Sequence, residues 1–193
     1  MQPNPQQNVT LKVIALALAG LGLLGLGALL FVYLMPSSAD AAGEPTEYAS
    51  AIPAAVNYPA PRLALHDLSG TSQALEDYRG KTVLVNHWAF WCGPCRAELP
   101  ELLAYYTAHR HQNFTIIGIE SGGEFEDVDW HVKEYGLTFP IWLDPEGDGL
   151  TAFKTQSLPS SFVIDPNGQV VLAWAGPVKR QVLEQFVTPL LEK

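Results

Sequence analysis

The chain has 193 residues, of which 48% are hydrophobic and 16% are charged, and its formal net charge at pH 7 is −9. The length fits one domain with an appendage, and the acidic balance argues against nucleic-acid binding because a phosphate backbone would be repelled. Two cysteines, Cys92 and Cys95, are too few for a disulfide-stapled scaffold or for a four-thiolate zinc site within one chain.

An uncharged apolar stretch occupies residues 13–35, directly after Lys12. A helix of this length would measure about 34 Å, enough to cross a hydrocarbon core of about 30 Å. We therefore predict a cytoplasmic N-terminus over residues 1–12 and a single transmembrane anchor over residues 13–35. All acidic residues lie at or after Asp40, so the positive-inside tendency places the rest of the chain outside the cytoplasm. A cleaved signal peptide is the alternative, with Ala39-Asp40-Ala41 as a weak cleavage motif.

The segment after the apolar stretch, residues 36–61, contains five prolines and many Ala, Ser and Glu residues. It has little hydrophobic periodicity, so we predict an extended linker. The remaining residues, 62–193, are predicted to form the folded domain, and a length of roughly 130 residues is ample for one hydrophobic core.

Strand-like and helix-like segments alternate along residues 62–193. Apolar runs typical of buried strands, or of the two arms of a hairpin, cover residues 82–88, 114–119, 139–143, 161–164 and 169–174. Helical patterns cover residues 93–111, 128–135 and 178–191. The turn sequence Asp165-Pro-Asn-Gly168 indicates that the last two strands form a hairpin. This order predicts an α/β domain in which a central mixed β-sheet is flanked by helices on both faces.

Two thiols separated by two residues follow the buried strand at the start of the first helix. Cys92 would lie at the helix N-terminus, where free N–H groups and the helix dipole favour a thiolate. Cys95, one turn further in, would be shielded and able to attack a mixed disulfide. Pro94 fits the first turn, where its missing N–H is not needed. Half of a zinc site or a static disulfide are the alternatives, but the histidines show no matching ligand spacing.

The motif Trp91-Cys-Gly-Pro-Cys95 resembles the active-site motif of the thioredoxin superfamily. More narrowly, residues 61–193 resemble the TlpA/ResA/CcmG (DsbE) group of membrane-anchored thiol-disulfide oxidoreductases. Further matching segments are Trp91 to Pro100, Tyr135 to Pro140, Leu143 to Pro145 and Leu158 to Asp165. The resemblance implies a three-layer thioredoxin-like fold, no cofactor, and a redox-active disulfide between Cys92 as nucleophile and Cys95 as resolving cysteine.

The resemblance also assigns a substrate site. Pro159 matches the cis-proline that faces the cysteine pair in the superfamily, with an ordinary trans proline as the alternative. Leu158 would then offer backbone hydrogen bonds to an extended substrate segment. Trp91, Gly93 and Pro94 are expected to line the same site.

Glu98 lies one helical turn after Cys95, where ResA-like proteins carry a glutamate that assists proton transfer. A partly buried carboxyl has a raised pKa, which suits it to accept and return a proton. The alternative is an acid that only stabilises the helix dipole. Asn86 stands where thioredoxin carries a buried aspartate, which favours the proton role for Glu98.

Two other groups of polar residues have simpler interpretations. His87 is expected to be a core histidine rather than a ligand. An acidic cluster is expected to form a solvated face, and it comprises Glu120, Glu124, Glu126, Asp127 and Asp129. Calcium binding is the alternative, but the cluster lacks the spacing of an EF-hand.

The resemblance implies a reductase of disulfides in exported proteins, with apocytochrome c as the leading substrate and a membrane thiol reductase of the DsbD/CcdA type as electron donor. A general disulfide oxidase or isomerase is the alternative. A peroxiredoxin-like peroxidase would want a lone peroxidatic cysteine, and a copper chaperone of the Sco type would want three residues between the cysteines. Two residues separate Cys92 from Cys95, which disfavours both.

Overall fold

The computed structural model describes residues 18, 26–27, 30–31 and 49–191. Within those residues, no helix is both long and apolar enough to cross a membrane. The predicted cytoplasmic segment, residues 1–12, lies outside the described residues, as does nearly all of the predicted anchor over residues 13–35.

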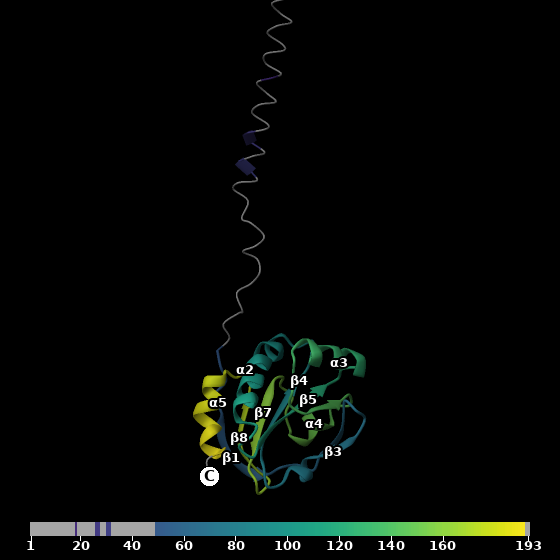
Figure 1. Ribbon diagram of the computed structural model, residues 1–193, viewed down its shortest axis with the longest axis vertical. Helices are drawn as coiled ribbons and strands as arrows, with labels where there is room; N and C mark the ends of the chain where they lie inside the picture. The colour runs from purple at the N-terminus through teal and green to yellow at the C-terminus, as the bar shows by residue number, and fades with distance from the viewer. Residues whose placement is uncertain (1–17, 19–25, 28–29, 32–48, 192–193) are drawn as a thin grey trace, which may run out of the picture. The chain divides into compact units, whose positions relative to one another are not determined.

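Residues 54–175 supply an eight-stranded mixed sheet with the strand order β1-β8-β7-β4-β5-β6-β2-β3 (Figure 1). Strands β4, β5 and β6 are parallel to one another, and every other neighbouring pair is antiparallel. The strands are β1 (Ala54–Pro59), β2 (Ala64–Asp67), β3 (Ser72–Ala74), β4 (Thr82–Trp88), β5 (Phe114–Ser121), β6 (Ile141–Asp144), β7 (Ser160–Ile164) and β8 (Gln169–Ala175).

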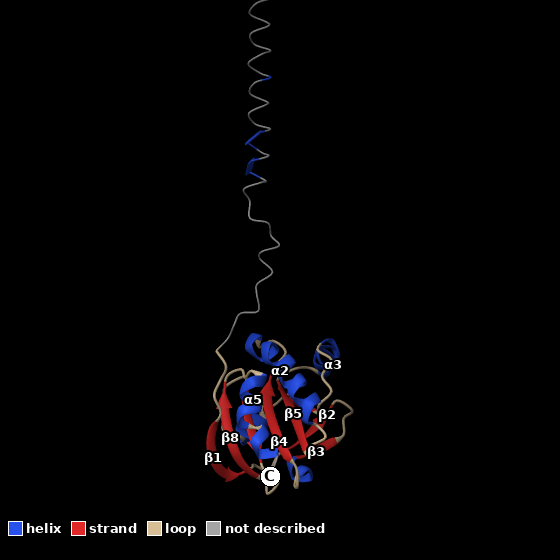
Figure 2. Ribbon diagram, turned by 60° about the vertical axis from the view of Figure 1, so that its left-hand side comes forward, coloured by secondary structure: helices blue, strands red, loops and turns tan. Residues whose placement is uncertain are grey.

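Helices cover both faces of the sheet, as the sequence predicts (Figure 2). Helices α2 and α5 pack on one face, while α4 and the short 3₁₀ helix η2 pack on the other. The helices are η2 (Leu75–Tyr78), α2 (Gly93–His109), α3 (Phe125–Glu134), α4 (Asp148–Ala152), α5 (Arg180–Phe186) and α6 (Thr188–Leu191).

The central strand β4 is buried along its whole length and divides its side chains between the two faces. Leu84 and Trp88 belong to the hydrophobic core under α2 and α5, whereas Val83 and Val85 belong to the core under α4. Because side chains alternate along a strand, Asn86 points to the α2 face and His87 to the α4 face. Because of this alternation, Asn86 and not His87 lies on the side of β4 that faces α2.

The predicted linker boundary at residue 61 is wrong. Residues 54–59 form the edge strand β1, which pairs with β8, and the amide of Ala51 donates a hydrogen bond to the carbonyl of Pro177 at 2.8 Å. Most β1 side chains are exposed, so the strand leaves no hydrophobic alternation in the sequence. Backbone pairing with β8, which only the folded domain provides, makes these residues a strand.

The remaining differences concern short elements and the last helix. Strands β2 and β3 and helix α4 were not predicted, because each is too short to give a clear periodic signal in the sequence. The single helix predicted over residues 178–191 is two helices, α5 and α6, which meet at Val187. Pro189 falls in the first turn of α6, where a missing N–H costs little.

Because β1 belongs to the sheet, a chain that begins at Arg62 should be less stable than one that begins at Ala49. The shorter chain loses several backbone hydrogen bonds, each contributing about 0.5–1.5 kcal/mol, so we expect a loss of about 2–4 kcal/mol. Urea unfolding of both chains, with the disulfide oxidised, measures this difference. Equal midpoints and slopes would show that β1 adds nothing to the domain.

Candidate active site

The redox pair lies where β4 runs into α2. The amide of Cys92 donates to the carbonyl of Ala89 at 3.1 Å, and this turn delivers Cys92 to the N-cap position of α2. Its Sγ accepts a hydrogen bond from the amide of Cys95 at 3.3 Å, while Pro94 occupies the first turn. A sulfur that already accepts an N–H at a helix start is placed to be stabilised as a thiolate.

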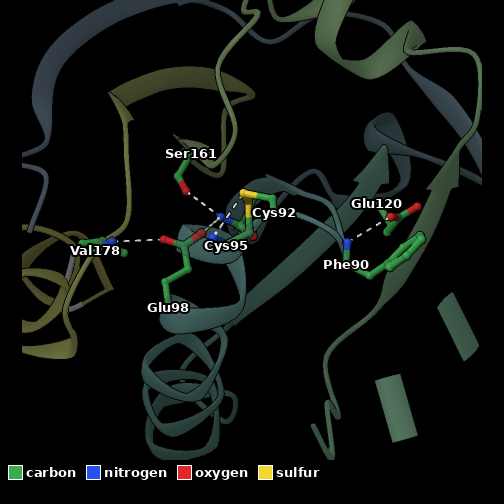
Figure 3. The surroundings of a disulfide bond; sticks show 8 residues. Phe90, Cys92, Cys95, Glu98, Glu120, Ser161 and Val178 are labelled. Atoms are coloured by element: carbon green, nitrogen blue, oxygen red, sulfur yellow. Dashed lines mark hydrogen bonds between the residues drawn. A yellow bond between two sulfur atoms is a disulfide. The ribbon is translucent and has the colours of Figure 1, made fainter. Parts of the chain in front are cut away.

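Cys92 and Cys95 are joined in a disulfide (Figure 3). Cys92 is 7% exposed, whereas Cys95 is completely buried. The sulfur that a second molecule can reach is therefore that of Cys92. This asymmetry fits the predicted roles of Cys92 as nucleophile and Cys95 as resolving cysteine.

Glu98 is completely buried one turn after Cys95 on the same helix. Its carboxyl accepts a hydrogen bond from Asn86 Nδ2 at 2.7 Å and another from the amide of Val178 at 3.0 Å. Asn86 Nδ2 also donates to Ser161 Oγ at 3.0 Å (Figure 3). The carboxyl thus joins α2 to β4 and to the segment before α5, directly behind the redox pair.

Burial raises the pKa of Glu98 to about 8, although the hydrogen bonds from Asn86 and Val178 act in the opposite direction. A carboxyl group with this pKa exchanges its proton near neutral pH, whereas a solvated first-turn acid would stay ionised. The geometry therefore fits the predicted proton acceptor and donor.

The residues expected to bind substrate lie in two segments of the chain. Trp91 is 60% exposed in the loop between β4 and α2, residues 89–92, which we call the redox loop, and Gly93 and Pro94 are exposed in the first turn of α2. The Leu158–Pro159 peptide bond is cis, and Leu158 is half-buried just before β7. Their predicted contact with an extended substrate segment stays a prediction.

Glu124, Glu126 and Asp127 are exposed, as expected of the acidic cluster, but the same expectation is wrong for Glu120. Glu120 is completely buried at the end of β5, where its carboxylate accepts a hydrogen bond from the amide of Gly123 at 2.9 Å. It accepts a second hydrogen bond from the amide of Phe90 at 3.3 Å (Figure 3). Burial raises its pKa. Its place at the end of the buried run 114–119 is the signal that sequence reasoning overlooked. Glu120 holds the loop that carries Cys92 from the side opposite Glu98.

His87 is a core residue, as expected. Its ring packs edge-on against Phe153 and Phe162, and burial lowers its pKa to about 4. Neither ring nitrogen has a hydrogen-bond partner among the described residues, so the imidazole stays neutral at physiological pH. Across residues 49–191, no group of three or more His, Cys, Asp or Glu side chains is arranged to hold a metal ion.

Comparison with known proteins places this geometry in a family. Residues 56–173 match the AhpC/TSA family. The thiol-disulfide oxidoreductase ResA of Geobacillus kaustophilus is 36% identical over 133 residues, covering 69% of this chain and 76% of that protein. ResA of Bacillus subtilis is 32% identical over 128 residues, or 66% of this chain and 72% of that protein.

Solved structures show the same thioredoxin fold. A thiol:disulfide interchange protein DsbE from Chlorobium tepidum superposes with a TM-score of 0.66 at 28% identity, covering 70% of this chain and 96% of that one. The thioredoxin domain of a thiol-disulfide oxidoreductase from Bacteroides vulgatus gives a TM-score of 0.64 at 30% identity, with 72% and 99% covered.

Replacing Glu98 with Gln should change how stability depends on pH. The pKa of Glu98 is higher in the folded protein than its ordinary value of 4.5, so the folded state holds the extra proton. Stability from this group is present below about pH 4.5 and is lost as pH rises through about 8. We expect Glu98→Gln to unfold like the wild type at low pH and to be a few kcal/mol more stable above about pH 8, since one pKa unit is about 1.4 kcal/mol.

Denaturant unfolding of both oxidised proteins between about pH 4 and pH 9 measures this difference. The groups that titrate in both proteins, including His87 and Glu120, cancel in the comparison. A constant offset across this range would show that Glu98 is not protonated in the folded state.

The exposure of the two sulfurs predicts which one forms adducts. After Cys95→Ser, reaction with a disulfide should stop at a stable mixed disulfide on Cys92, because no second thiol is present to resolve it. After Cys92→Ser, the buried Cys95 should form the adduct at least about tenfold more slowly, since thiol reactivity depends on access. Intact-mass spectrometry during reaction with oxidised glutathione reads both rates. Equal rates would reverse or abolish the assigned roles.

Proposed function

Because the chain belongs to the ResA thiol-disulfide oxidoreductases of the AhpC/TSA family, we propose that it acts as a reductase of disulfides in exported proteins. The observation that supports this proposal best is the pairing of a reachable sulfur, Cys92, with a buried sulfur and a buried carboxyl behind it. With this arrangement, Cys92 can attack a partner's disulfide, and Cys95 can then resolve the resulting mixed disulfide without a second protein.

The reaction transfers two electrons from the protein to the substrate. The Cys92 thiolate attacks one sulfur of the substrate disulfide, forms a mixed disulfide and expels the first substrate thiolate, which takes a proton from solvent. Cys95 then attacks Cys92 Sγ as a thiolate, expels the second substrate sulfur as a thiolate that takes a proton from solvent, and closes the Cys92–Cys95 disulfide. Glu98, as a carboxylate, takes the proton that Cys95 loses. The protein is oxidised by two electrons and the substrate is reduced by two.

Glu98 serves the return reaction in its protonated form. A donor thiolate attacks Cys92, and Cys95 leaves as a thiolate in the protein interior. An unpaired charge there is costly, so a nearby acid with a pKa near neutrality lowers that cost by giving up its proton. The donor disulfide then forms as the donor's second thiol releases Cys92.

The proposed substrate is apocytochrome c, whose paired cysteines must be reduced before haem attachment. The resemblance to the ResA and CcmG group supports this choice. We propose further that residues 13–35 anchor the chain in the membrane with residues 1–12 in the cytoplasm and the domain outside it. A membrane thiol reductase of the DsbD/CcdA type would then return electrons to Cys92.

Direct reduction of a Cys-X-X-Cys-His peptide disulfide tests this function. The reduced protein should convert the peptide to its dithiol, and its reduction potential should lie nearer the thioredoxin value of about −270 mV than the DsbA value of about −120 mV. Mass spectrometry of the peptide and equilibration with glutathione provide the two measurements.

Cys92→Ser, which removes the accessible sulfur, is the matched control for this assay. If the disulfide form of the wild type instead oxidises the peptide dithiol, and its potential is near that of DsbA, the chain is an oxidase and the proposed direction is wrong.

A further inference from the structure

Three large aromatic side chains are exposed close to the redox loop. Trp91, next to the nucleophile Cys92, is 60% exposed, Trp130 is 58% exposed and Phe125 is 44% exposed. The last two lie on α3, which stands at the same end of the sheet as the start of α2 in both views (Figures 1 and 2). Exposed indoles and phenyl rings in one region mark an interaction site more often than isolated apolar residues do.

Ring contacts connect α3 to the redox loop. The ring centroids of Phe90 and His131 are 4.8 Å apart, and those of His131 and Trp130 are 4.7 Å apart. His131 is held in place because its Nδ1 lies 2.8 Å from the carbonyl oxygen of Asp127. We call Phe90, Trp91, Phe125, Trp130 and His131 the aromatic edge.

The buried carboxyl group of Glu120 also fixes the position of the aromatic edge. Glu120 accepts one hydrogen bond from the amide of Phe90, in the redox loop, and another from that of Gly123, in the turn that leads into α3. One buried carboxylate thus ties both parts of the edge to the end of β5. A ligand bound on Trp130 would therefore be held at a defined place relative to Cys92.

The charges around Trp130 indicate what kind of ligand the edge fits. Residues three or four positions away on a helix are neighbours, and those of Trp130 include Glu126, Asp127 and Glu134, all exposed. The remaining neighbour, Lys133, is paired with Asp129 at 2.6 Å. Three of the four residues that neighbour Trp130 along α3 are therefore acidic and exposed, on a chain of net charge −9.

We propose that the aromatic edge docks an arginine- or lysine-bearing segment of the disulfide substrate, with a cationic side chain stacked on Trp130 while the disulfide reaches Cys92. An exposed cation–π contact is favourable, and the surrounding carboxylates attract the same cation and repel an acidic segment. This inference rests on the proposed function and specifies its substrate as a basic polypeptide.

Two synthetic peptides, each closed by one intramolecular disulfide, provide the test. They are identical except that arginine flanks the cysteines in one and glutamate in the other. The neutral small molecule bis(2-hydroxyethyl) disulfide is the third substrate, because it has no cationic group that could stack on Trp130. Second-order rate constants are measured with the reduced full chain in neutral detergent.

The wild type should reduce the arginine peptide faster than the glutamate peptide, and the preference should shrink at high salt. Trp130→Leu should slow the arginine peptide about two- to fivefold, the size expected for an exposed cation–π contact, whereas Trp130→Phe should retain part of the rate. Asp127→Lys should reduce the preference. All three variants should reduce the small disulfide at the wild-type rate.

Asp77→Lys is the matched control for Asp127→Lys. It makes the same charge change on η2, which precedes the start of β4, whereas the redox loop follows the end of β4. An equal loss of preference in both variants would show that net charge alone acts and would overturn the inference. An unchanged preference in Trp130→Leu and Asp127→Lys would overturn it as well. No exchange with any of the three disulfides would contradict the proposed function, and this inference with it.

Discussion

A carboxyl group kept out of water behind a disulfide is the constraint on which the rest of the site depends. Glu98 is completely buried, and among the described residues two N–H groups, from Asn86 and Val178, donate to its oxygens. Leaving such a group ionised in an apolar surrounding is costly unless further donors are present. The fold supplies enough hydrogen bonds to keep the carboxyl in place and too few to keep it ionised, and so it holds an exchangeable proton beside Cys95.

A second buried carboxyl performs a different task on the other side of the redox loop. Glu120 accepts the amides of Phe90 and Gly123 and so joins the redox loop to the turn before α3. Glu98 joins α2 to β4 and to the segment before α5. Glu120 therefore fixes the loop that carries Cys92 through a backbone N–H group, whereas Glu98 fixes the helix that follows this loop through a side-chain amide and a backbone N–H group. Glu98 lies one helical turn after Cys95, whereas Glu120 is bonded to the two segments that carry the exposed aromatic residues.

The identity of the redox pair and its location could be predicted because both depend on local sequence. The buried run from Thr82 to Trp88 predicts a strand, and the structure has β4 at the same residues. The helix expected from Gly93 begins there, with Cys92 at its N-cap, because capping and the first-turn proline act within a few residues. The interpretation of His87 as a core residue is confirmed for the same reason, since alternation along β4 is a local property.

The sequence by itself determined the chemistry: two thiols at a helix start, a carboxyl group one turn later, and an amide at Asn86 where thioredoxin carries an acid. Tertiary structure alone decided how that chemistry is tuned. The pKa of Glu98 depends on burial beneath residues as distant along the chain as Val178, and β1 is a strand only because β8 offers it hydrogen-bond partners. Glu120 is likewise buried rather than on the surface, and its carboxyl group accepts a hydrogen bond from the amide of Phe90, in a loop far from it in sequence. Solvation and strand pairing depend on contacts between distant residues, and such contacts exist only once the whole domain has folded.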